Sequence, residues 1–152
     1  MPRLEHGVAK AGVRGVQWPQ IEYSLMHRVP ESNGLLDLCK ELNITVIAYS
    51  PLAQGMLSGK YGPDNLPTGV RRRRYGKKLV GIQPLVTLLG ELGQKYDKSA
   101  AQVAINWTVC KGTVPIPGAR NARQAQENLG AIGWRLDASD ILSLDEASAE
   151  LS

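Results

Sequence analysis

The chain has 152 residues, of which 43% are hydrophobic, and a formal net charge of +4, so one domain with a core of its own is expected. A mean hydropathy of -0.20 favours a soluble chain, no apolar run approaches the ~20 residues of a membrane span, and the N-terminus lacks the apolar core of a signal peptide. Four basic residues form the single run Arg71 to Arg74 and the other charges are mixed, so composition does not favour a nucleic-acid partner.

The first expected elements, in chain order, lie between residues 3 and 49. Residues 3–12 have the pattern of a helix remnant, and Val16–Ser24 has the pattern of a strand in which Pro19 limits central pairing. A helix is predicted next, because apolar residues recur at helical spacing at Leu35, Leu36, Leu38, Cys39 and Leu42. Asn43 is suited to end that helix in the left-handed conformation, and the β-branched run Ile44–Tyr49 predicts a buried strand.

A long connection follows over residues 51–79, rich in Gly and Pro and without periodicity. Connections of this length in compact domains are usually functional lids or disordered segments. The Arg71 to Arg74 run falls within it, so we expect those side chains on a solvated loop tip. There they can attract phosphate groups weakly and in a salt-dependent way, but the run lacks the interleaved aromatics of single-strand nucleic-acid binders.

Two helices are predicted after this connection. The first ends near Tyr96 and carries an apolar stripe formed by Leu85, Leu88, Leu89 and Leu92. The second begins after Ser99, a favourable cap, and its buried face is expected to contain Val103, Ala104, Trp107 and Cys110.

The C-terminal part predicts one more strand and two more helices. Thr113–Ile116 has the strand pattern, and Asn121 caps a helix that runs through Asn128. The last helix covers residues 137–149, with Ile141, Leu142 and Leu144 expected to face inward. Strands that alternate with helices in this way imply a parallel sheet with right-handed crossovers.

Neither the cysteines nor the histidines suggest a metal site or a catalytic residue. Cys39 and Cys110 lie in apolar helical contexts without Cys-x-x-Cys spacing, which favours two buried reduced thiols over a disulfide. His6 lies in the helix remnant and His27 in a loop, and both are expected to be solvated surface groups.

Three blocks of sequence resemble the last three strand–loop units of aldo-keto reductases. They are Gln20–Leu25, Ala48–Tyr61 and Ile116–Asn128, in the family's order and at its spacing. The resemblance runs from about residue 14 to the C-terminus and is closest to the plant and cyanobacterial type, so a cytoplasmic or plastid location is expected. It implies an α/β fold: residues 1–152 would be a single C-terminal portion of a (β/α)8 TIM barrel, about three β/α units plus a C-terminal helix.

The resemblance also implies which part of such an enzyme is covered. A complete barrel needs about 250 residues, and this chain supplies about three strands. It would begin within the fifth barrel helix, so the family's Asp, Tyr, Lys and His catalytic tetrad would not be among these residues. We therefore expect the chain alone to lack catalytic activity.

By the same resemblance, the chain carries the half of the barrel that binds NADP(H). Gln20 would hydrogen-bond the nicotinamide carboxamide, because an amide both donates and accepts, although a Gln that only satisfies buried backbone groups is the alternative. The family usually has Asn before this Gln, where the chain has Pro19. Tyr49 would stack on the nicotinamide ring. The loop that holds the pyrophosphate would contain Ser50, Leu52, Gln54, Gly55 and Leu57, with Gly55 permitting close backbone approach.

The eighth strand and the helix after it would bind the adenosine end. Gly118 leads to Arg120, whose guanidinium would bind the 2′-phosphate and favour NADP over NAD. Arg123 would assist, unless it is a solvated surface group. Gln124, Glu127 and Asn128 share one face of the helix, and the helix N-terminus at Asn121 adds a favourable dipole.

Three readings of function stay open on the sequence alone. The chain is part of an NADPH-dependent oxidoreductase that reduces aldehydes and ketones to alcohols, or a non-catalytic nucleotide-binding or interaction module, or a vestigial chain without a stable fold. A three-stranded piece of a barrel has open strand edges and an apolar inner face, around Ile44, Val46 and Ala48 or their alternates. We therefore expect self-association or pairing with a complementary half-barrel.

Overall fold

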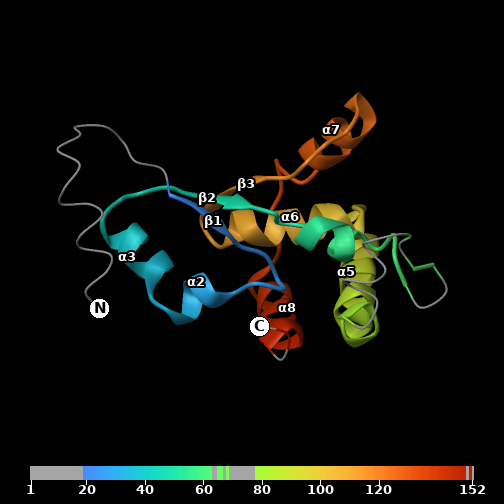
Figure 1. Ribbon diagram of the computed structural model, residues 1–152, viewed down its shortest axis with the longest axis horizontal. Coiled ribbons are helices and arrows are strands. Elements are labelled where there is room, and N and C mark those ends of the chain that lie inside the picture. The colour runs from blue at the N-terminus through green and yellow to red at the C-terminus, as the bar shows by residue number, and fades with distance from the viewer. Residues whose placement is uncertain (1–18, 63–64, 67, 69–77, 150, 152) are drawn as a thin grey trace.

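A computed structural model describes residues 19–62, 65, 66, 68, 78–149 and 151 (Figure 1). The expected helix remnant over residues 3–12, the first three residues of the strand expected over Val16–Ser24, and the Arg71 to Arg74 run lie outside the described residues. None of the helices within the described ranges combines the length and the apolar content that crossing a bilayer requires.

The sheet has three parallel strands in the order β1-β2-β3. They are β1 (Gln20–Glu22), β2 (Val46–Tyr49) and β3 (Thr113–Ile116). The predicted parallel α/β arrangement is therefore confirmed. The expected strand to Ser24 ends earlier, at Glu22, because Ser24 and His27 exchange backbone hydrogen bonds in a tight turn. Pro19 lies just before β1 at the edge of the sheet, where its carbonyl accepts from the Ile47 N–H.

Helices connect the strands, and their ends follow local signals in the sequence. Between β1 and β2 lie α2 (Val29–Ser32) and α3 (Leu35–Glu41); Asn43 follows α3 with a φ of 53°, as predicted. Between β2 and β3 lie α5 (Gln83–Tyr96) and α6 (Ala100–Cys110). Ser99 caps α6 in a complete capping box with Gln102.

The remaining elements are a short 3-10 helix and two C-terminal helices. The 3-10 helix η1 (Ala53–Ser58) falls within the connection predicted over residues 51–79, and a helical stretch over residues 78–81 begins at the end of that connection. The helices α7 (Ala122–Leu129) and α8 (Ala138–Ala149) follow β3. In α8, Leu144 is buried, but Leu142 is 58% exposed. The expectation that Leu142 faces inward was wrong. Residues three or four apart share a face of a helix, and Leu142 is only two residues from the buried Leu144, so it lies on a different face.

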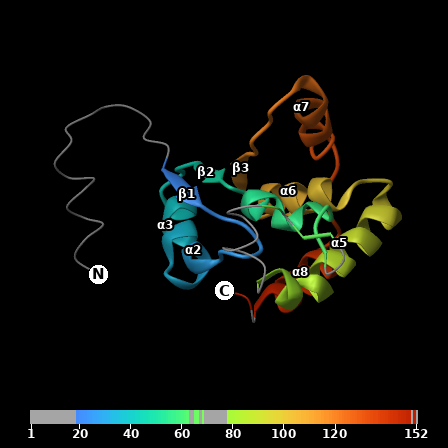
Figure 2. The same ribbon diagram turned by 45° about the vertical axis from the view of Figure 1, so that its right-hand side comes forward.

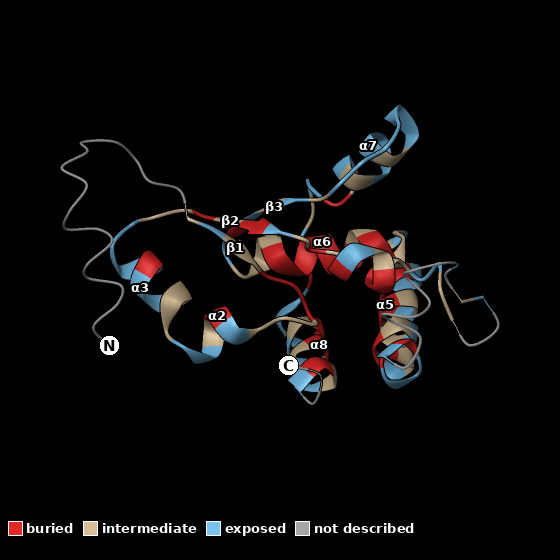
Figure 3. Cartoon of the chain, viewed as in Figure 1, coloured by how far each residue is buried: buried red, intermediate tan, exposed pale blue. Residues whose placement is uncertain are grey.

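In the part of the chain that the structure describes, helices cover one face of the sheet and leave the other open. Figure 3 shows the buried residues concentrated on α6, on β2 and along the facing sides of α5 and α8. Val46 and Ala48 of β2 point into this core. The core also contains Val103, Ala104 and Trp107 of α6 as predicted, whereas Cys110 is only half-buried.

The open face consists of the alternate residues of each strand. Gln20, Ile47 and Val114 form one row across the sheet, and Glu22, Tyr49 and Ile116 form the next. Val114 is 49% exposed and Ile116 46% exposed. The expected apolar face therefore exists, but it contains the alternates: Val46 and Ala48 lie on the covered side. Figure 2 shows α7 standing away from the helices that cover the sheet.

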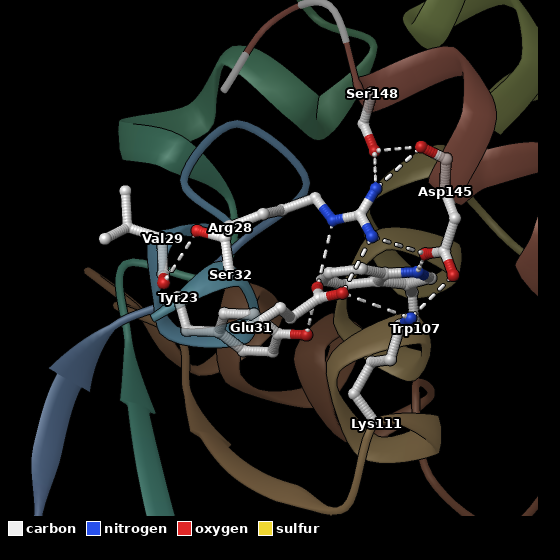
Figure 4. Close-up of polar contacts among 9 residues, drawn as sticks. All are labelled: Tyr23, Arg28, Val29, Glu31, Ser32, Trp107, Lys111, Asp145 and Ser148. Carbon is white, nitrogen blue, oxygen red and sulfur yellow. Dashed lines mark hydrogen bonds and ion pairs between the residues drawn. The ribbon is translucent and has the colours of Figure 1, made fainter. Parts of the chain in front are cut away.

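A cluster of two buried aromatic residues and four half-buried charged residues joins the turn after β1 to α6 and α8 (Figure 4). We call Tyr23, Arg28, Glu31, Trp107, Lys111 and Asp145 the clasp. Arg28 makes two hydrogen bonds to the Glu31 carboxylate, at 2.9 and 2.7 Å, and a third to the Asp145 carbonyl at 2.6 Å. Asp145 accepts from the Trp107 indole N–H at 2.9 Å and from the Lys111 ammonium at 2.6 Å.

The clasp changes the titration of its members. Burial, followed by the hydrogen bond to Glu31, raises the pKa of Tyr23. Burial alone would raise the pKa of Glu31, but hydrogen bonds from Arg28 and Tyr23 outweigh it and hold this pKa below its ordinary value. The guanidinium of Arg28 and the ammonium of Lys111 both lie over the Trp107 ring, at 5.7 and 5.3 Å from its centroid. The clasp thus pairs its charges internally and holds three elements together.

Candidate functional site

A cavity of about 920 Å³ opens beyond the carboxyl ends of β2 and β3. Parallel α/β folds carry their ligand sites at this end of the sheet. Three segments form its walls: the turn after β2 with η1, the segment after β3, and one face of α7. The lining residues are Tyr49, Ser50, Pro51, Leu52, Gln54, Gly55, Ser58, Lys60, Tyr61, Ala101, Ile116, Pro117, Gly118, Ala119, Arg120, Arg123, Gln124, Glu127 and Asn128.

Tyr49, at the end of β2, presents its ring on the open face of the sheet. It is 41% exposed, and its backbone carbonyl accepts from the Tyr23 N–H at 3.3 Å, which holds the end of β2 against the chain leaving β1. Gln20 lies on the same face, one strand away and one row earlier. An aromatic ring and a side-chain amide therefore lie on one surface near the cavity.

The turn after β2 is tight and carries several left-handed residues. Ser50, Ala53, Gln54 and Gly55 all have positive φ, and Gly55 has the most extreme value, 93°. The turn is closed by hydrogen bonds from the Ala53 N–H to the Ser50 carbonyl at 2.8 Å and from the Ser58 hydroxyl to the Gly55 carbonyl at 2.6 Å. Any side chain at this φ is strained, so the position favours glycine. Without a side chain, Gly55 leaves this part of the cavity wall unobstructed.

The opposite wall is the start of α7. Asn121 caps the helix by accepting from the Gln124 N–H at 3.0 Å. The Gln124 carboxamide in turn accepts from the Arg120 N–H at 2.8 Å, and Asn128 donates to the Gly118 carbonyl at 3.3 Å. These bonds tie the segment after β3 to the helix face that the sequence predicted, so the backbone of Arg120 has a defined position.

The helix α7 is anchored to the core at its far end. Gln102 of α6 donates to the Glu127 carbonyl at 2.8 Å. Its carboxamide lies so close to Gly130 that a Cβ there would approach the Gln102 amide nitrogen to 2.2 Å. A side chain at position 130 would therefore displace the Gln102 carboxamide and with it the hydrogen bond that joins α6 to α7.

The cavity carries more positive than negative charge. Three cationic side chains, Lys60, Arg120 and Arg123, line it together with one carboxylate, Glu127. Within the described part of the chain, neither Arg120 nor Arg123 makes an ion pair, and both are exposed. Lys60 lies over the Tyr61 ring, 5.7 Å from its centroid. Unpaired guanidinium groups at a helix N-terminus are suited to an anionic ligand.

The structure brings together all the residues predicted for the cofactor site except two. Leu57 is fully buried in the hydrophobic core and Gln20 lies on β1, so neither belongs to the cavity lining. The cavity adds Ser58, Lys60 and Tyr61, which were not predicted. Their signal was the Ser58-Gly59-Lys60 sequence, where a lysine follows a Gly-punctuated turn.

Comparison with known proteins gives consistent matches. The model of the Aldo/keto reductase family matches residues 7–149. The chain is 45% identical over 131 residues to the chloroplastic pyridoxal reductase of Arabidopsis thaliana, covering 86% of this chain and 36% of that protein. It is 35% identical over 143 residues to the L-glyceraldehyde 3-phosphate reductase of Escherichia coli O157:H7, covering 86% of this chain and 41% of that protein.

A third relative and two solved structures complete the comparison. The Aldo-keto reductase yakc [NADP(+)] of Schizosaccharomyces pombe is 33% identical over 147 residues, covering 90% of this chain and 43% of that protein. The thermostable aldo-keto reductase Tm1743 matches with a TM-score of 0.69 at 24% identity, over 95% of this chain and 44% of that one. The glycerol dehydrogenase AKR11B4 of Gluconobacter oxydans matches with a TM-score of 0.74 at 24% identity, over 86% of this chain and 42% of that one. The chain thus spans less than half the length of these proteins.

Proposed function

The chain belongs to the aldo/keto reductase family, and from that premise we propose that its cavity binds NADP(H). The observation that carries the proposal is the gathering of the predicted residues, from the end of β2 to α7, around one cavity at the carboxyl ends of the strands. In this proposal residues 1–152 are the C-terminal, cofactor-binding portion of a (β/α)8 barrel. A cytoplasmic or plastid location stays a prediction.

The residues present fit a dinucleotide with a phosphorylated ribose. The cavity lining combines an aromatic ring, a turn with a glycine and cationic side chains. Tyr49 provides an aromatic face for the nicotinamide ring. Gly55 has no side chain and so leaves room for the pyrophosphate, and Lys60 supplies a positive charge in the same cavity. Arg120 and Arg123 provide charge for the 2′-phosphate, which is the feature that favours NADP(H) over NAD(H).

When bound, NADP(H) supplies the hydride that reduces an aldehyde or ketone to an alcohol. The residues of this chain bind and orient it: Tyr49 fixes which face of the ring is presented, and Gln20 on the neighbouring strand aligns the carboxamide. In this proposal Tyr49 and Lys60 bind the cofactor, and none of the described cavity residues has the role of proton donor to the carbonyl oxygen. We therefore propose that the 152-residue chain by itself does not catalyse carbonyl reduction, since general-acid catalysis contributes about 10²–10⁴-fold.

Nucleotide titration and an activity assay test these two parts separately. We expect NADPH to bind the purified chain, as measured by the quenching of tryptophan fluorescence or by calorimetry, and to bind more tightly than NADH. Absence of NADPH binding by a folded chain would contradict the proposed site. Steady NADPH oxidation that depends on an added aldehyde would contradict only the proposed inactivity.

We also propose that the open face of the sheet makes the chain self-associate or pair with a complementary half-barrel. Among the described residues, no helix covers Ile47, Tyr49, Val114 and Ile116 on this face, and the outer edges of β1 and β3 carry backbone groups that can pair with another strand. Val114→Asp is expected to reduce association in light scattering, because it places a charge in this face. Leu142→Asp is the control, since Leu142 is 58% exposed against 49% for Val114 but lies on α8. Equal association of both variants and the unchanged chain would contradict this assignment.

A further inference from the structure

The outer edge of β1 presents complete backbone hydrogen-bonding groups. This strand lies at one edge of the sheet. The chain bonds to β2 just before and just after it: the Pro19 carbonyl accepts from the Ile47 N–H at 2.9 Å, and the Tyr23 N–H donates to the last residue of β2 at 3.3 Å. Successive residues of a strand direct their N–H and C=O groups to opposite edges. Within the described residues, the N–H and C=O groups of Gln20 and Glu22 therefore point outward, away from β2.

The outer edge of β3 lacks one hydrogen-bond donor. Ile47 directs its backbone groups to β1, so Val46 and Ala48, on either side of it, direct theirs to β3. Thr113 and Pro115 are the residues opposite these two. A residue in a parallel ladder bonds to the two neighbours of the residue opposite, so Thr113 and Pro115 direct their own groups outward. Because proline has no N–H, this edge is a poorer template for another strand than the edge of β1.

Gln20 and Glu22 also carry complementary side chains on the open face of the sheet. Gln20 is exposed and Glu22 is half-buried. Within the described residues, neither side chain makes a hydrogen bond or an ion pair. A carboxamide N–H donates hydrogen bonds and a carboxylate accepts them. The outer edge of β1 thus offers one donor and one acceptor side chain to a neighbouring strand.

A second, antiparallel copy of β1 satisfies these groups in one register. With a two-fold axis at Ile21, Gln20 of each copy lies opposite Glu22 of the other, and each such pair can exchange both backbone hydrogen bonds. The Gln20 carboxamide then lies opposite a Glu22 carboxylate, which is a favourable cross-strand pair. A register centred on Glu22 instead places two carboxylates directly opposite each other, which is unfavourable.

We propose that two copies of the chain pair through their β1 edges, antiparallel about a two-fold axis at Ile21, and so join their two sheets into one. This contact uses backbone groups at the edge of the sheet. It is therefore separate from the association through the open face that is proposed above, and it does not depend on nucleotide binding.

The difference between the two edges also sets the size of this assembly. Pairing of β1 with β1 uses the same surface in both copies, so it closes at two chains. Pairing of β1 in one copy with β3 in the next would add chains head to tail without closing. Pro115 disfavours that second arrangement because it removes a donor from the outer edge of β3.

Amide hydrogen exchange of the unchanged chain, followed by NMR over a range of protein concentrations, tests the contact directly. We expect the exchange of the Gln20 and Glu22 amides to slow as the concentration rises. The Thr113 amide is the internal control, because it points outward from β3, and its exchange should not change. Equal slowing at Thr113, or exchange that does not depend on concentration at all three amides, would overturn the proposal.

Disulfide trapping tests the register. Ile21 would face its own copy in a pair without backbone hydrogen bonds, where the Cα atoms are about 4.5 Å apart, a distance that a disulfide can bridge. We expect Ile21→Cys to form a covalent dimer on mild oxidation, reversed by dithiothreitol. The unchanged chain is the control, since its own Cys39 and Cys110 lie on helices. Failure of Ile21→Cys to cross-link faster than the unchanged chain would refute this register.

Three substitutions separate the edge contact from the open face, with assembly size measured by light scattering. Glu22→Pro removes an outward N–H and leaves the inward bonds of β1 in place, so we expect it to lose the dimer. Pro115→Val restores the missing donor on β3 and should give larger assemblies. Val114→Asp should keep the concentration dependence at Gln20 and Glu22. A dimer that survives Glu22→Pro but is lost in Val114→Asp would assign association to the open face alone, and a strictly monomeric unchanged chain would contradict both contacts.

Discussion

Arg28 and Arg120 show how two regions of this chain use the same side chain in opposite ways. Arg28 lies in the clasp, where two carboxylates, a backbone carbonyl and an indole ring surround its guanidinium. Arg120 lies at the rim of the nucleotide cavity, is exposed, and has no ion pair within the described residues. In the clasp the charges satisfy one another, whereas at the cavity rim positive charge is left for a ligand.

This difference separates stability from binding. A buried charge with complete partners is costly to disturb, because its removal leaves the partners unpaired in a poorly solvated place. An exposed cation contributes little to folding but forms strong bonds when an anion arrives. Substitutions in the clasp should therefore change the free energy of unfolding, and substitutions at the cavity should change nucleotide affinity.

The largest expected effect is that of Arg28→Ala. It removes one of the two cations that Glu31 and Asp145 share, the other being Lys111, and breaks both hydrogen bonds to Glu31, so we expect a loss of about 3–5 kcal/mol in the free energy of unfolding, measured by urea denaturation. Arg135→Ala is the control, since Arg135 is exposed and makes one long hydrogen bond of 3.5 Å to a backbone carbonyl. Equal losses in the free energy of unfolding for Arg28→Ala and Arg135→Ala would contradict a stabilising role of the clasp.

Arg120→Ala should give the next largest effect, and in binding only. We expect NADP(H) affinity to fall by about 1.5–3 kcal/mol, the contribution of a charge-assisted hydrogen bond, with NAD(H) affinity and urea denaturation nearly unchanged. Calorimetric titration of both nucleotides measures this. Equal losses for NADP(H) and NAD(H) would refute the 2′-phosphate role of Arg120.

Glu31→Gln tests the clasp through its pH dependence. The pKa of Glu31 is lowered from an ordinary value of 4.5, so the folded state favours the carboxylate. Its stabilising contribution is present above pH 4.5 and is lost as the pH falls through the lower folded pKa. We expect Glu31→Gln to cost about 1–2 kcal/mol at pH 7, with the difference from the unchanged chain shrinking in acid. A difference that stays constant from pH 7 to pH 3 would show that charge is not its source.

The smallest expected effect is that of Gly55→Ala at the cavity. Its φ of 93° strains any L side chain, at a cost of about 1–2 kcal/mol. Gly133→Ala is the matched control, because Gly133 has a φ of 86° and open space around it, but lies outside the cavity. Both variants should lose similar stability, and only Gly55→Ala should weaken NADP(H) binding. Equal binding losses would argue against close approach of the ligand at Gly55.

Elements marked by local chemistry were predictable from the sequence. Ser99 and Asn121 cap α6 and α7 as expected, and Asn43 adopts the left-handed conformation after α3. Capping and left-handed stops depend on residues within one turn of each other, so sequence neighbours are sufficient to specify them. The site loop after β2 was recognisable for a related reason, since its residues are contiguous in the chain.

Other features depended on the tertiary structure. The alternation of β2 is compatible with either face being covered, and only the packing of α6 decided that Val46 and Ala48 are buried while Tyr49 is exposed. The same packing took Leu57 into the core and away from the cavity, and brought Lys60 to its lining. The clasp joins Arg28 to Asp145 across 117 positions. The sequence thus determined where elements begin and end, because those signals are local, whereas faces and long-range partners were decided by which helices cover the sheet.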